Sequence, residues 1–253
     1  MFLNDINCDV YIGKGAGKKL LIDIENAQHS VKILSPFLSP FLVKKLINLH
    51  YRDIDVQLIT ADTIEDFYGD RKRNIHELIQ QHVHIDGEAS ADRKQWEKTK
   101  RILNWILILL IGLTFWFAYE FKDIRTLGVL ISIALLFLIG QFLKAKIRNK
   151  RVFSYSYEQL FPFKVMVSQD ANKFSEMYLH GKIYIIDDKI AYLGSLNFTG
   201  GGTKNNYETR IRLSDTESVQ KIIEEFDHLL HNEKLPEISI QTWGKRLYQE
   251  PIN

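Results

Sequence analysis

Two runs of uncharged, mostly apolar residues occupy the middle of this 253-residue chain, at residues 102–119 and 127–143. Each run is about 17–18 residues long, which is the short end of what crosses a bilayer as a helix. A pair of helices packed inside a soluble protein would show a polar stripe, and neither run has one. These runs therefore predict a two-helix transmembrane hairpin. The polar interruptions, none of them charged, are Asn104, Thr114, Ser132 and Gln141.

Basic side chains are concentrated outside the two runs rather than between them. The connection at residues 120–126 holds only Lys122 and Arg125, beside acidic residues. Because the cytoplasmic flanks of membrane helices carry the excess of Lys and Arg, we expect a multi-pass protein of the cytoplasmic membrane. Both termini and the rest of the chain are then expected on the cytoplasmic side. The flanking cations are Arg93, Lys94, Lys98, Lys100, Arg101, Lys144, Lys146, Arg148, Lys150 and Arg151.

The hairpin divides the remainder of the chain into two parts. Because both ends of a hairpin leave the membrane on the same side, it can be inserted into a domain without disrupting it. About 190 residues remain outside it, which is enough for one α/β core. We expect residues 1–90 to form the N-terminal half of that domain, residues 91–151 the hairpin with its basic flanks, and residues 152–253 the C-terminal half.

Apolar spacing in the N-terminal half predicts helices that alternate with strands. Leu20, Leu21, Ile24 and Ala27 follow a helical period before an expected strand at residues 31–34. A helix at residues 40–51 is expected before a strand at residues 56–60. The fold class is therefore α/β, with a mixed sheet flanked by helices. The single cysteine agrees with a reducing compartment, and the first residues lack the pattern of a cleaved signal.

Six polar or small residues near the C-terminus follow the fixed spacing H-x-K-x4-D-x6-G-S-x-N. At average residue usage this pattern arises by chance roughly once in 10⁸ positions. Alternating apolar residues around its start predict a strand, so the first His and Lys share one face. The Ser and Asn near its end are again two apart and can point into the same pocket. The six residues are His180, Lys182, Asp187, Gly194, Ser195 and Asn197.

This set of side chains suits a phosphodiester. The imidazole of His180 can attack phosphorus or carry a proton near neutral pH. The ammonium of Lys182 can neutralise charge on phosphoryl oxygens, and the hydroxyl of Ser195 and the amide of Asn197 can donate to the same oxygens. Gly194 allows the backbone to approach a ligand closely. We therefore expect a site that needs neither a metal nor a cofactor.

The spacing is the signature of the phospholipase D superfamily, and residues of about 164–231 closely resemble its members. The part at about residues 11–66 looks like the matching first half of that fold. The resemblance implies that His180 is the nucleophile or acid and that Lys182 and Asn197 bind phosphate with support from Ser195. It implies a structural role for Asp187 within the catalytic motif, and it implies that Glu208 orients His180.

Members of this superfamily use two such motifs in each working site, and this chain has one. The resemblance to single-motif members therefore implies a homodimer in which each subunit gives one His180 to a shared site. A dimer with two-fold symmetry is also the commonest oligomer.

The substrate is left open between three readings. The first is a membrane-anchored nuclease, an endonuclease acting on DNA or RNA, with defence against foreign nucleic acid as one hypothesis for its role. The glycine-rich residues 200–202 favour it, whereas the formal net charge of only +2 does not. The second is a phospholipase D or phosphatidyltransferase acting on membrane phospholipids. The third is a membrane subunit that recruits a larger complex.

Other motifs are interpreted as structural. The glycine- and lysine-rich residues 13–19 lack the spacing of a phosphate loop, and His82 and His84 lack the further ligands of a zinc site. The basic residues 71–73 are expected to head a helix that runs through Gln81, as a solvated face or a nucleic-acid contact. Residues 214–217 are expected to cap the last helix, and the tail at 241–248 is not assigned.

Overall fold

A seven-stranded mixed sheet organises the larger of two units in the computed structural model, which describes residues 2–4, 6–61, 75–121, 127–167, 179–233, 235 and 237–253. This unit comprises Met1–Gln80 and Tyr157–Tyr248. The strand order is β1-β9-β8-β7-β2-β3-β6. The strands are β1 (Asp9–Lys14), β2 (Ser30–Leu34), β3 (Asp55–Ala61), β6 (Phe163–Met166), β7 (Ile183–Ile186), β8 (Ile190–Gly194) and β9 (Tyr207–Leu213).

The two halves of the sequence meet at the centre of this sheet. Strands β2, β3 and β6 are parallel, whereas β7 pairs antiparallel with β2 in a register that places Leu34 opposite Ile183. Strands β8, β9 and β1 continue the sheet as antiparallel neighbours. The expected α/β fold with a mixed sheet is therefore confirmed, and its sheet is continuous across the insertion.

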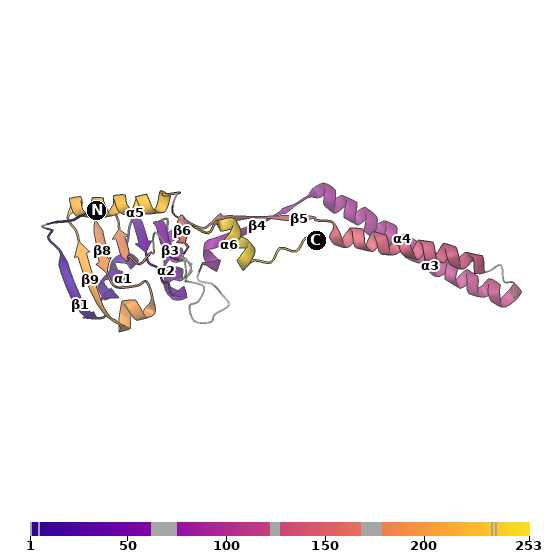
Figure 1. Ribbon diagram of the computed structural model, residues 1–253, viewed down its shortest axis with the longest axis horizontal. Coiled ribbons are helices and arrows are strands. Elements are labelled where there is room, and N and C mark those ends of the chain that lie inside the picture. Colours follow the sequence, from indigo (N-terminus) through magenta and orange to yellow (C-terminus); the bar gives the residue numbers. More distant parts are fainter. Residues whose placement is uncertain are drawn as a thin grey trace. The chain divides into compact units, whose positions relative to one another are not determined.

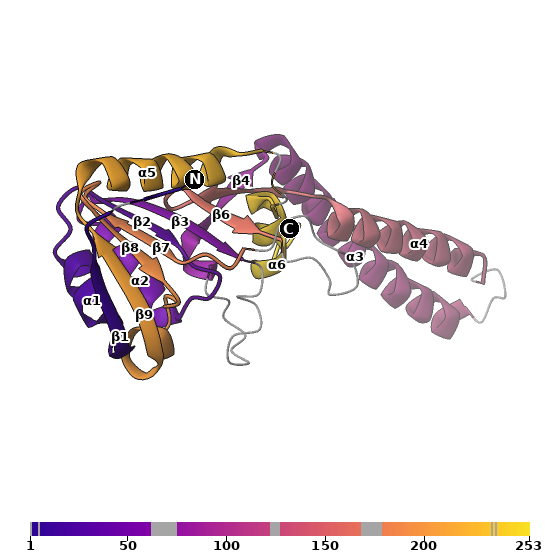
Figure 2. The same cartoon turned by 60° about the vertical axis from the view of Figure 1, so that its left-hand side comes forward.

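Helices cover both faces of the sheet (Figure 2). On one face α5 (Thr216–His231) buries Val219, Ile222 and Phe226 against core residues such as Ile185 and Leu213. On the other face lie α1 (Gly17–Glu25) and α2 (Pro40–His50), whose buried apolar positions match the expected helical stripes. The larger unit also holds the 3-10 helix η2 (His76–Leu78), the single-turn π-helix η4 (Gly201–Asn205) and α6 (Ile240–Leu247).

The smaller unit comprises Gln81–Ser156 and Gln249–Asn253. Its helices α3 (Gly87–Phe121) and α4 (Leu127–Asn149) lie side by side along the apolar runs (Figure 1). Both helices are long and apolar enough to cross a membrane, and almost none of either apolar window is buried in the protein. The expected pair of helices is confirmed. The strands β4 (Ile79–Ile85) and β5 (Phe153–Gln159) form a separate two-stranded sheet.

Two local expectations differ from the structure, and one unassigned segment takes a defined form. Of the helix expected through Gln81, only His76–Leu78 is helical within the described residues, because Ile79–Ile85 form strand β4, while residues 71–73 lie outside the described residues. The cap of α5 is Asp215, whose carboxylate accepts from the Ser218 N–H at 2.9 Å, so the helix starts one residue later than the capping-box spacing indicates. The unassigned tail forms α6, which buries Trp243 completely.

Candidate active site

His180 and Lys182 meet at the edge of the sheet where the parallel strands end. They immediately precede β7, whose first residue, Ile183, pairs with the last residue of β2. The Lys182 Nζ lies 3.2 Å from His180 Nδ1 and 3.3 Å from Nε2, and it donates to the His180 carbonyl at 2.7 Å. His180 is exposed and Lys182 is buried. The expectation that both side chains project together is met by these contacts.

The expected alternation also holds on the opposite face of this segment. Leu179 and Ile185 lie in the hydrophobic core cluster, and Ile183 packs against it. Regular β pairing begins only at Ile183, so the strand is shorter than the apolar pattern indicates. Core packing of Leu179 nevertheless anchors the backbone next to His180, so the imidazole is presented from a fixed point of the scaffold.

Ser195 and Glu208 form the second part of the site, at the end of β8 and the start of β9. The Ser195 hydroxyl donates to Glu208 Oε2 and accepts from the Thr209 N–H at 3.0 Å. The other carboxylate oxygen of Glu208 accepts from Asn206 Nδ2 at 3.2 Å. Glu208 is buried, so these donors offset the loss of hydration of its charge. The carboxylate is thereby held in one position beside the basic groups.

The charges of Glu208 and Lys182 influence one another. Burial lowers the pKa of Lys182 from its ordinary value, and the negative charge of Glu208 acts in the opposite direction. Burial also raises the pKa of the Tyr184 hydroxyl, which donates to the Leu196 carbonyl at 2.6 Å. Tyr184 is therefore a neutral donor that holds the loop, whereas Lys182 is a partly desolvated cation with little water to screen it.

Asn197 retains hydrogen-bonding capacity. Its Oδ1 is buried and has no hydrogen-bond partner among the described residues. Its backbone is tightly packed, because a Cβ at Gly202 would lie 2.5 Å from the Asn197 carbonyl oxygen. A buried amide with an unsatisfied end is costly unless a ligand or water completes it. Because Oδ1 can only accept, its missing partner is a donor such as water or a hydroxyl group, and it is the Nδ2 group of the same amide that can donate to phosphoryl oxygens.

Two buried serines that sequence reasoning missed hold the loop around Asn197. Ser35 Oγ accepts from the Phe198 N–H at 2.9 Å, and Ser39 Oγ accepts from the Gly200 N–H at 3.1 Å. Both serines follow β2, so the first half of the chain fixes a loop of the second half. The sequence signal for Ser35 is that it stands directly after a buried strand, at the edge where ligands bind in open α/β sheets, and that for Ser39 is its position just before the Pro at the start of α2.

Asp187 lies at the opposite end of β7 from the His180–Lys182 pair. Its carboxylate accepts from the backbone N–H groups of Gln28, His29 and Ser30, at 2.7–3.1 Å. Burial alone would raise the pKa of Asp187, but these hydrogen bonds outweigh it and hold the pKa below its ordinary value. Asp187 also has a φ of 54°, which the β7–β8 turn requires. The structure thus joins Asp187 to the start of β2 and not to the other motif residues.

Gly194 is required by the neighbouring strand. A Cβ at this position would lie 2.0 Å from the carbonyl oxygen of Thr209 in β9. The close approach that the sequence analysis assigned to a ligand is therefore made by the protein's own backbone. Any side chain at residue 194 would push β9 away and displace Glu208, which stands one residue before Thr209.

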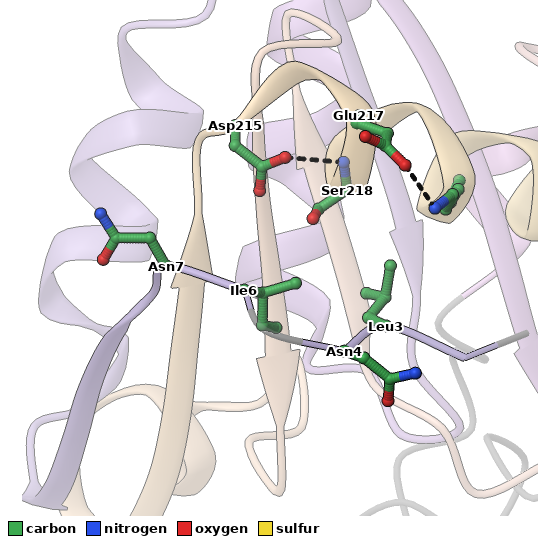
Figure 3. Close-up of a pocket in the computed structure, with 8 residues that line it drawn as sticks. Leu3, Asn4, Ile6, Asn7, Asp215, Glu217 and Ser218 are labelled. Atoms are coloured by element: carbon green, nitrogen blue, oxygen red, sulfur yellow. Dashed lines mark hydrogen bonds and ion pairs between the residues drawn. The ribbon is translucent and has the colours of Figure 1, made fainter.

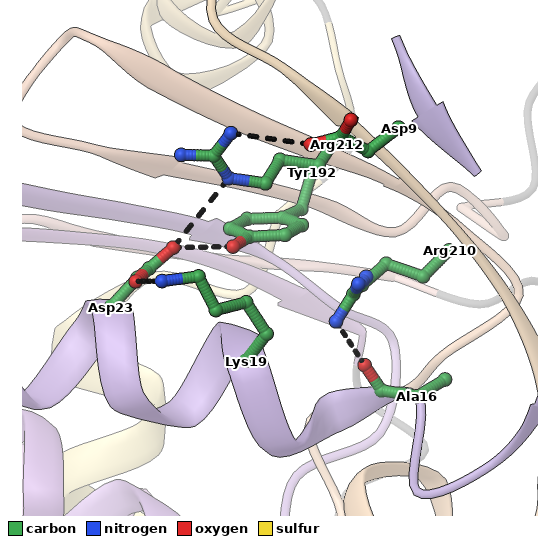
Figure 4. A network of polar contacts seen from close by, with 7 residues as sticks. All are labelled: Asp9, Ala16, Lys19, Asp23, Tyr192, Arg210 and Arg212. Carbon is green, nitrogen blue, oxygen red and sulfur yellow. Dashed lines mark hydrogen bonds and ion pairs between the residues drawn. The ribbon is translucent and has the colours of Figure 1, made fainter. Parts of the chain in front are cut away.

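A polar network on the α1 face supports strand β9 (Figure 4). Asp23 accepts from the Tyr192 hydroxyl and lies 3.7 Å from the Arg212 guanidinium. Arg210 donates to the Ala16 carbonyl at 2.9 Å, just before α1. Burial, followed by the hydrogen bond and charge of Asp23, raises the pKa of Tyr192 above its ordinary value. Glu208, Arg210 and Arg212 are two residues apart along β9 and therefore lie on the same face of the strand. The contacts of the two arginines thus help to fix the position of the strand that carries Glu208.

A hollow of about 300 Å³ at the opposite end of the domain carries no comparable chemistry (Figure 3). It lies between four residues near the N-terminus and the start of α5, and the four are Leu3, Asn4, Ile6 and Asn7. Asp215 caps the helix there, and Glu217 accepts from Lys221 at 2.7 Å. Its charged groups are already paired within the helix, so we assign the hollow to packing. Within the described residues, no group of three or more His, Cys, Asp or Glu could hold a metal ion.

Known proteins resemble this chain over part of its length. Residues 138–230 match the family model described as "Cardiolipin synthase, PLD-like domain". A cardiolipin synthase of Geobacillus sp. (strain WCH70) is 28% identical over 152 residues, which is 57% of this chain and 30% of that protein. A mitochondrial cardiolipin hydrolase of Mus musculus is 40% identical over 52 residues, 21% of this chain and 24% of that protein. The chain thus spans less than a third of each of these two relatives.

Solved structures also resemble this chain, at low sequence identity. NucT from Helicobacter pylori covers 92% of this chain and is itself covered to 99%, with 17% sequence identity and a TM-score of 0.47. The phospholipase D family member Nuc from Salmonella typhimurium has 14% identity, the same coverage and a TM-score of 0.43.

Proposed function

Because this chain belongs to the phospholipase D superfamily, we propose that it is a phosphodiesterase whose nucleophile is His180. The observation that carries this proposal is the cluster at the strand edge. An exposed imidazole lies within 3.3 Å of a buried ammonium, and Asn197 stands in the loop that follows Ser195, with its Oδ1 unsatisfied among the described residues. A phosphoryl group placed there would lie beside the positive charge of Lys182, and Asn197 Nδ2 could donate to one of its oxygens.

In the first step, a ring nitrogen of His180 attacks phosphorus. The new N–P bond forms as the P–O bond to the leaving alcohol breaks, and a second histidine protonates the leaving oxygen. In the second step that histidine takes a proton from water, whose oxygen attacks phosphorus and releases His180. Lys182 and Asn197 stabilise the charge on the non-bridging oxygens in both steps. Glu208 holds Ser195 in place and supplies the counter-charge to Lys182.

The second histidine is proposed to be His180 of another copy of the chain. The motif occurs once in the sequence, so one chain supplies one imidazole of this kind. A two-fold axis beside the strand edge would bring two copies of His180 and Lys182 to one phosphate. The exposed position of His180 supports this arrangement, because its ring is accessible to a partner.

Nucleic acid is our first candidate substrate. The loop beside Asn197 presents Lys204, whose Nζ lies 5.6 Å from the centre of the exposed Phe41 ring. A cation next to an exposed aromatic ring can contact a backbone phosphate and stack a base, the combination found in binders of single-stranded nucleic acid. Gly200 packs against the Phe41 ring and Gly202 against the Asn197 backbone, so these glycines fix the rim close to the site.

Phospholipid is the second candidate, and a different observation favours it. The curated relatives named above are a cardiolipin synthase and a cardiolipin hydrolase. Almost no residue in the apolar windows of α3 and α4 is buried in the protein, which supports insertion into a membrane. An enzyme anchored in this way would meet lipid phosphodiesters directly. We propose that the basic flanks hold both termini and the catalytic domain on the cytoplasmic side.

One assay separates the candidates. The full chain in detergent is incubated with single- and double-stranded DNA and RNA, and separately with phosphatidylglycerol, cardiolipin and phosphatidylcholine vesicles. Cleavage of nucleic acid that is lost in His180→Ala supports the nuclease, and release of phosphatidic acid or a free head group supports the phospholipase. If a folded, dimeric chain cleaves none of these substrates, the enzyme proposal is overturned in favour of a recruitment subunit.

A further inference from the structure

A polar hollow lies on the helical hairpin at the level where its apolar runs begin. It has a volume of about 350 Å³ and lies within the smaller unit, between α3 and α4. Ile102 opens the apolar run of α3 directly after this level, and Leu143 closes that of α4 before it. The residues that line it are Glu97, Lys100, Arg101, Asn104 and Ile147.

Three cations of the hairpin flanks are engaged by the protein itself. Arg93 lies 3.2 Å from Glu97, Lys150 lies 2.8 Å from Asp92, and Lys146 lies 4.1 Å from the centre of the Trp96 ring. By contrast, Lys100 and Arg101 form no ion pair with any acidic side chain in the described part of the chain.

The lining combines charge with an apolar floor. Lys100 and Arg101 provide two positive charges, Asn104 provides an amide, and Ile147 provides apolar surface from the facing helix. The one acidic residue, Glu97, is already paired with Arg93. An arginine fork matches phosphate oxygens geometrically, and a lysine adds a point charge. Exposed apolar side chains such as Trp105 and Ile108 continue away from the hollow along the helix.

We propose that this hollow binds the phosphate head group of an anionic phospholipid of the cytoplasmic leaflet. The head group lies on Lys100, Arg101 and Asn104, and the acyl chains follow the exposed apolar face of α3. The inference rests on the proposed insertion of the hairpin into a membrane. It adds a specific lipid site, distinct from His180, to a hairpin that would otherwise be only an anchor.

The test removes the two cations that line the hollow and leaves the total charge matched in a control. The variant K100Q/R101Q is compared with K94Q/K98Q, which loses two cations of the same flank that do not line the hollow. Both are made in a His180→Ala background, so that no lipid is consumed and the catalytic site is the same in all samples. Phosphatidylglycerol and phosphatidylcholine retained by the full chain are measured by native mass spectrometry, and circular dichroism verifies helix content.

We expect K100Q/R101Q to reduce retained phosphatidylglycerol about tenfold, K94Q/K98Q to change it less than about twofold, and phosphatidylcholine to be unaffected. Equal losses in both variants would overturn the site, because they would reflect general attraction to charge. Displacement of the lipid by excess inorganic phosphate would also overturn it. A chain that alkaline carbonate strips from vesicles would instead refute the proposed membrane insertion, so the two failures are distinguishable.

Discussion

The two ends of the β7–β8 hairpin carry residues of the same sequence motif but differ in how their polar groups are satisfied. At one end Lys182 contacts both ring nitrogens of His180, and the amide of Asn197 has an unsatisfied oxygen. At the other end Asp187 accepts from three backbone N–H groups and has a positive φ.

Residues of one motif can therefore serve different physical purposes. An unsatisfied polar atom and a desolvated cation indicate a substrate-binding site. A carboxylate whose hydrogen bonds are all made to backbone N–H groups indicates a structural role in connecting two segments of the chain. The comparison predicts that substitutions at the first end change activity and leave stability unaltered, and that substitutions at the second end do the reverse.

The largest expected effect concerns His180 and the proposed sharing of one site by two chains. His180→Ala should lower the cleavage rate by at least about 10³-fold without changing the unfolding temperature. When this variant is mixed with the unaltered chain and subunits exchange, activity per total protein should fall with the square of the unaltered fraction. A linear fall would mean that each chain works alone, and the two-fold arrangement would have to be abandoned.

A smaller loss of activity is expected for Lys182. Lys182→Met should lower kcat about 10²-fold, because a buried ammonium beside the reacting phosphate is replaced by an uncharged chain of similar length. Lys182→Arg should recover only part of this loss, since a guanidinium has a different shape. The exposed Lys189, in the turn at the other end of the hairpin, provides the control, and steady-state kinetics should find Lys189→Met unchanged. A similar loss in both would contradict the comparison.

The smallest effect on activity, with a measurable effect on stability, is expected for Asp187. Asp187→Asn should lower the free energy of unfolding by about 1–3 kcal/mol, because three backbone N–H groups would then donate to a neutral amide instead of a charged carboxylate. Asp187→Ala should cost about 1–2 kcal/mol more, because φ is positive there. Asp188→Asn alters the neighbouring positive-φ residue and the ion pair between the half-exposed Asp188 and the buried Lys32. It should cost less than about 1 kcal/mol, because Lys32 keeps its contact with Asp227 at 3.4 Å.

The effect of Asp187 should depend on pH. Its pKa in the folded protein lies below the ordinary value, so its stabilising contribution is present above the unfolded pKa and is lost as pH falls through the folded pKa. The stability difference between the unaltered chain and Asp187→Asn should therefore shrink from about pH 5 downwards. Chemical denaturation at several pH values measures it. A difference that is constant with pH, or a large loss of kcat in Asp187→Asn, would break the contrast between the two ends.

Local sequence patterns predicted elements whose evidence is contained in a short segment. The apolar runs predicted the paired helices, and the spacing at residues 40–51 predicted α2 to within one residue. Alternation around His180 predicted which side chains face the core. Local patterns predicted a helix through Gln81, whereas Ile79–Ile85 form a strand, because that strand is stabilised by pairing with β5, about 70 residues away.

The residue types available for catalysis and the two long apolar helices can be read from the sequence, since both follow from residue identity and from spacing along a few turns or strands. The positions at which the reactive side chains come together depend on the folded chain. It paired β2 with β7, used Ser35 and Ser39 to hold the loop of Asn197, and separated Asp187 from His180. The physical reason is that these contacts join residues roughly 160 positions apart, and no local period encodes which distant donors will meet which acceptors.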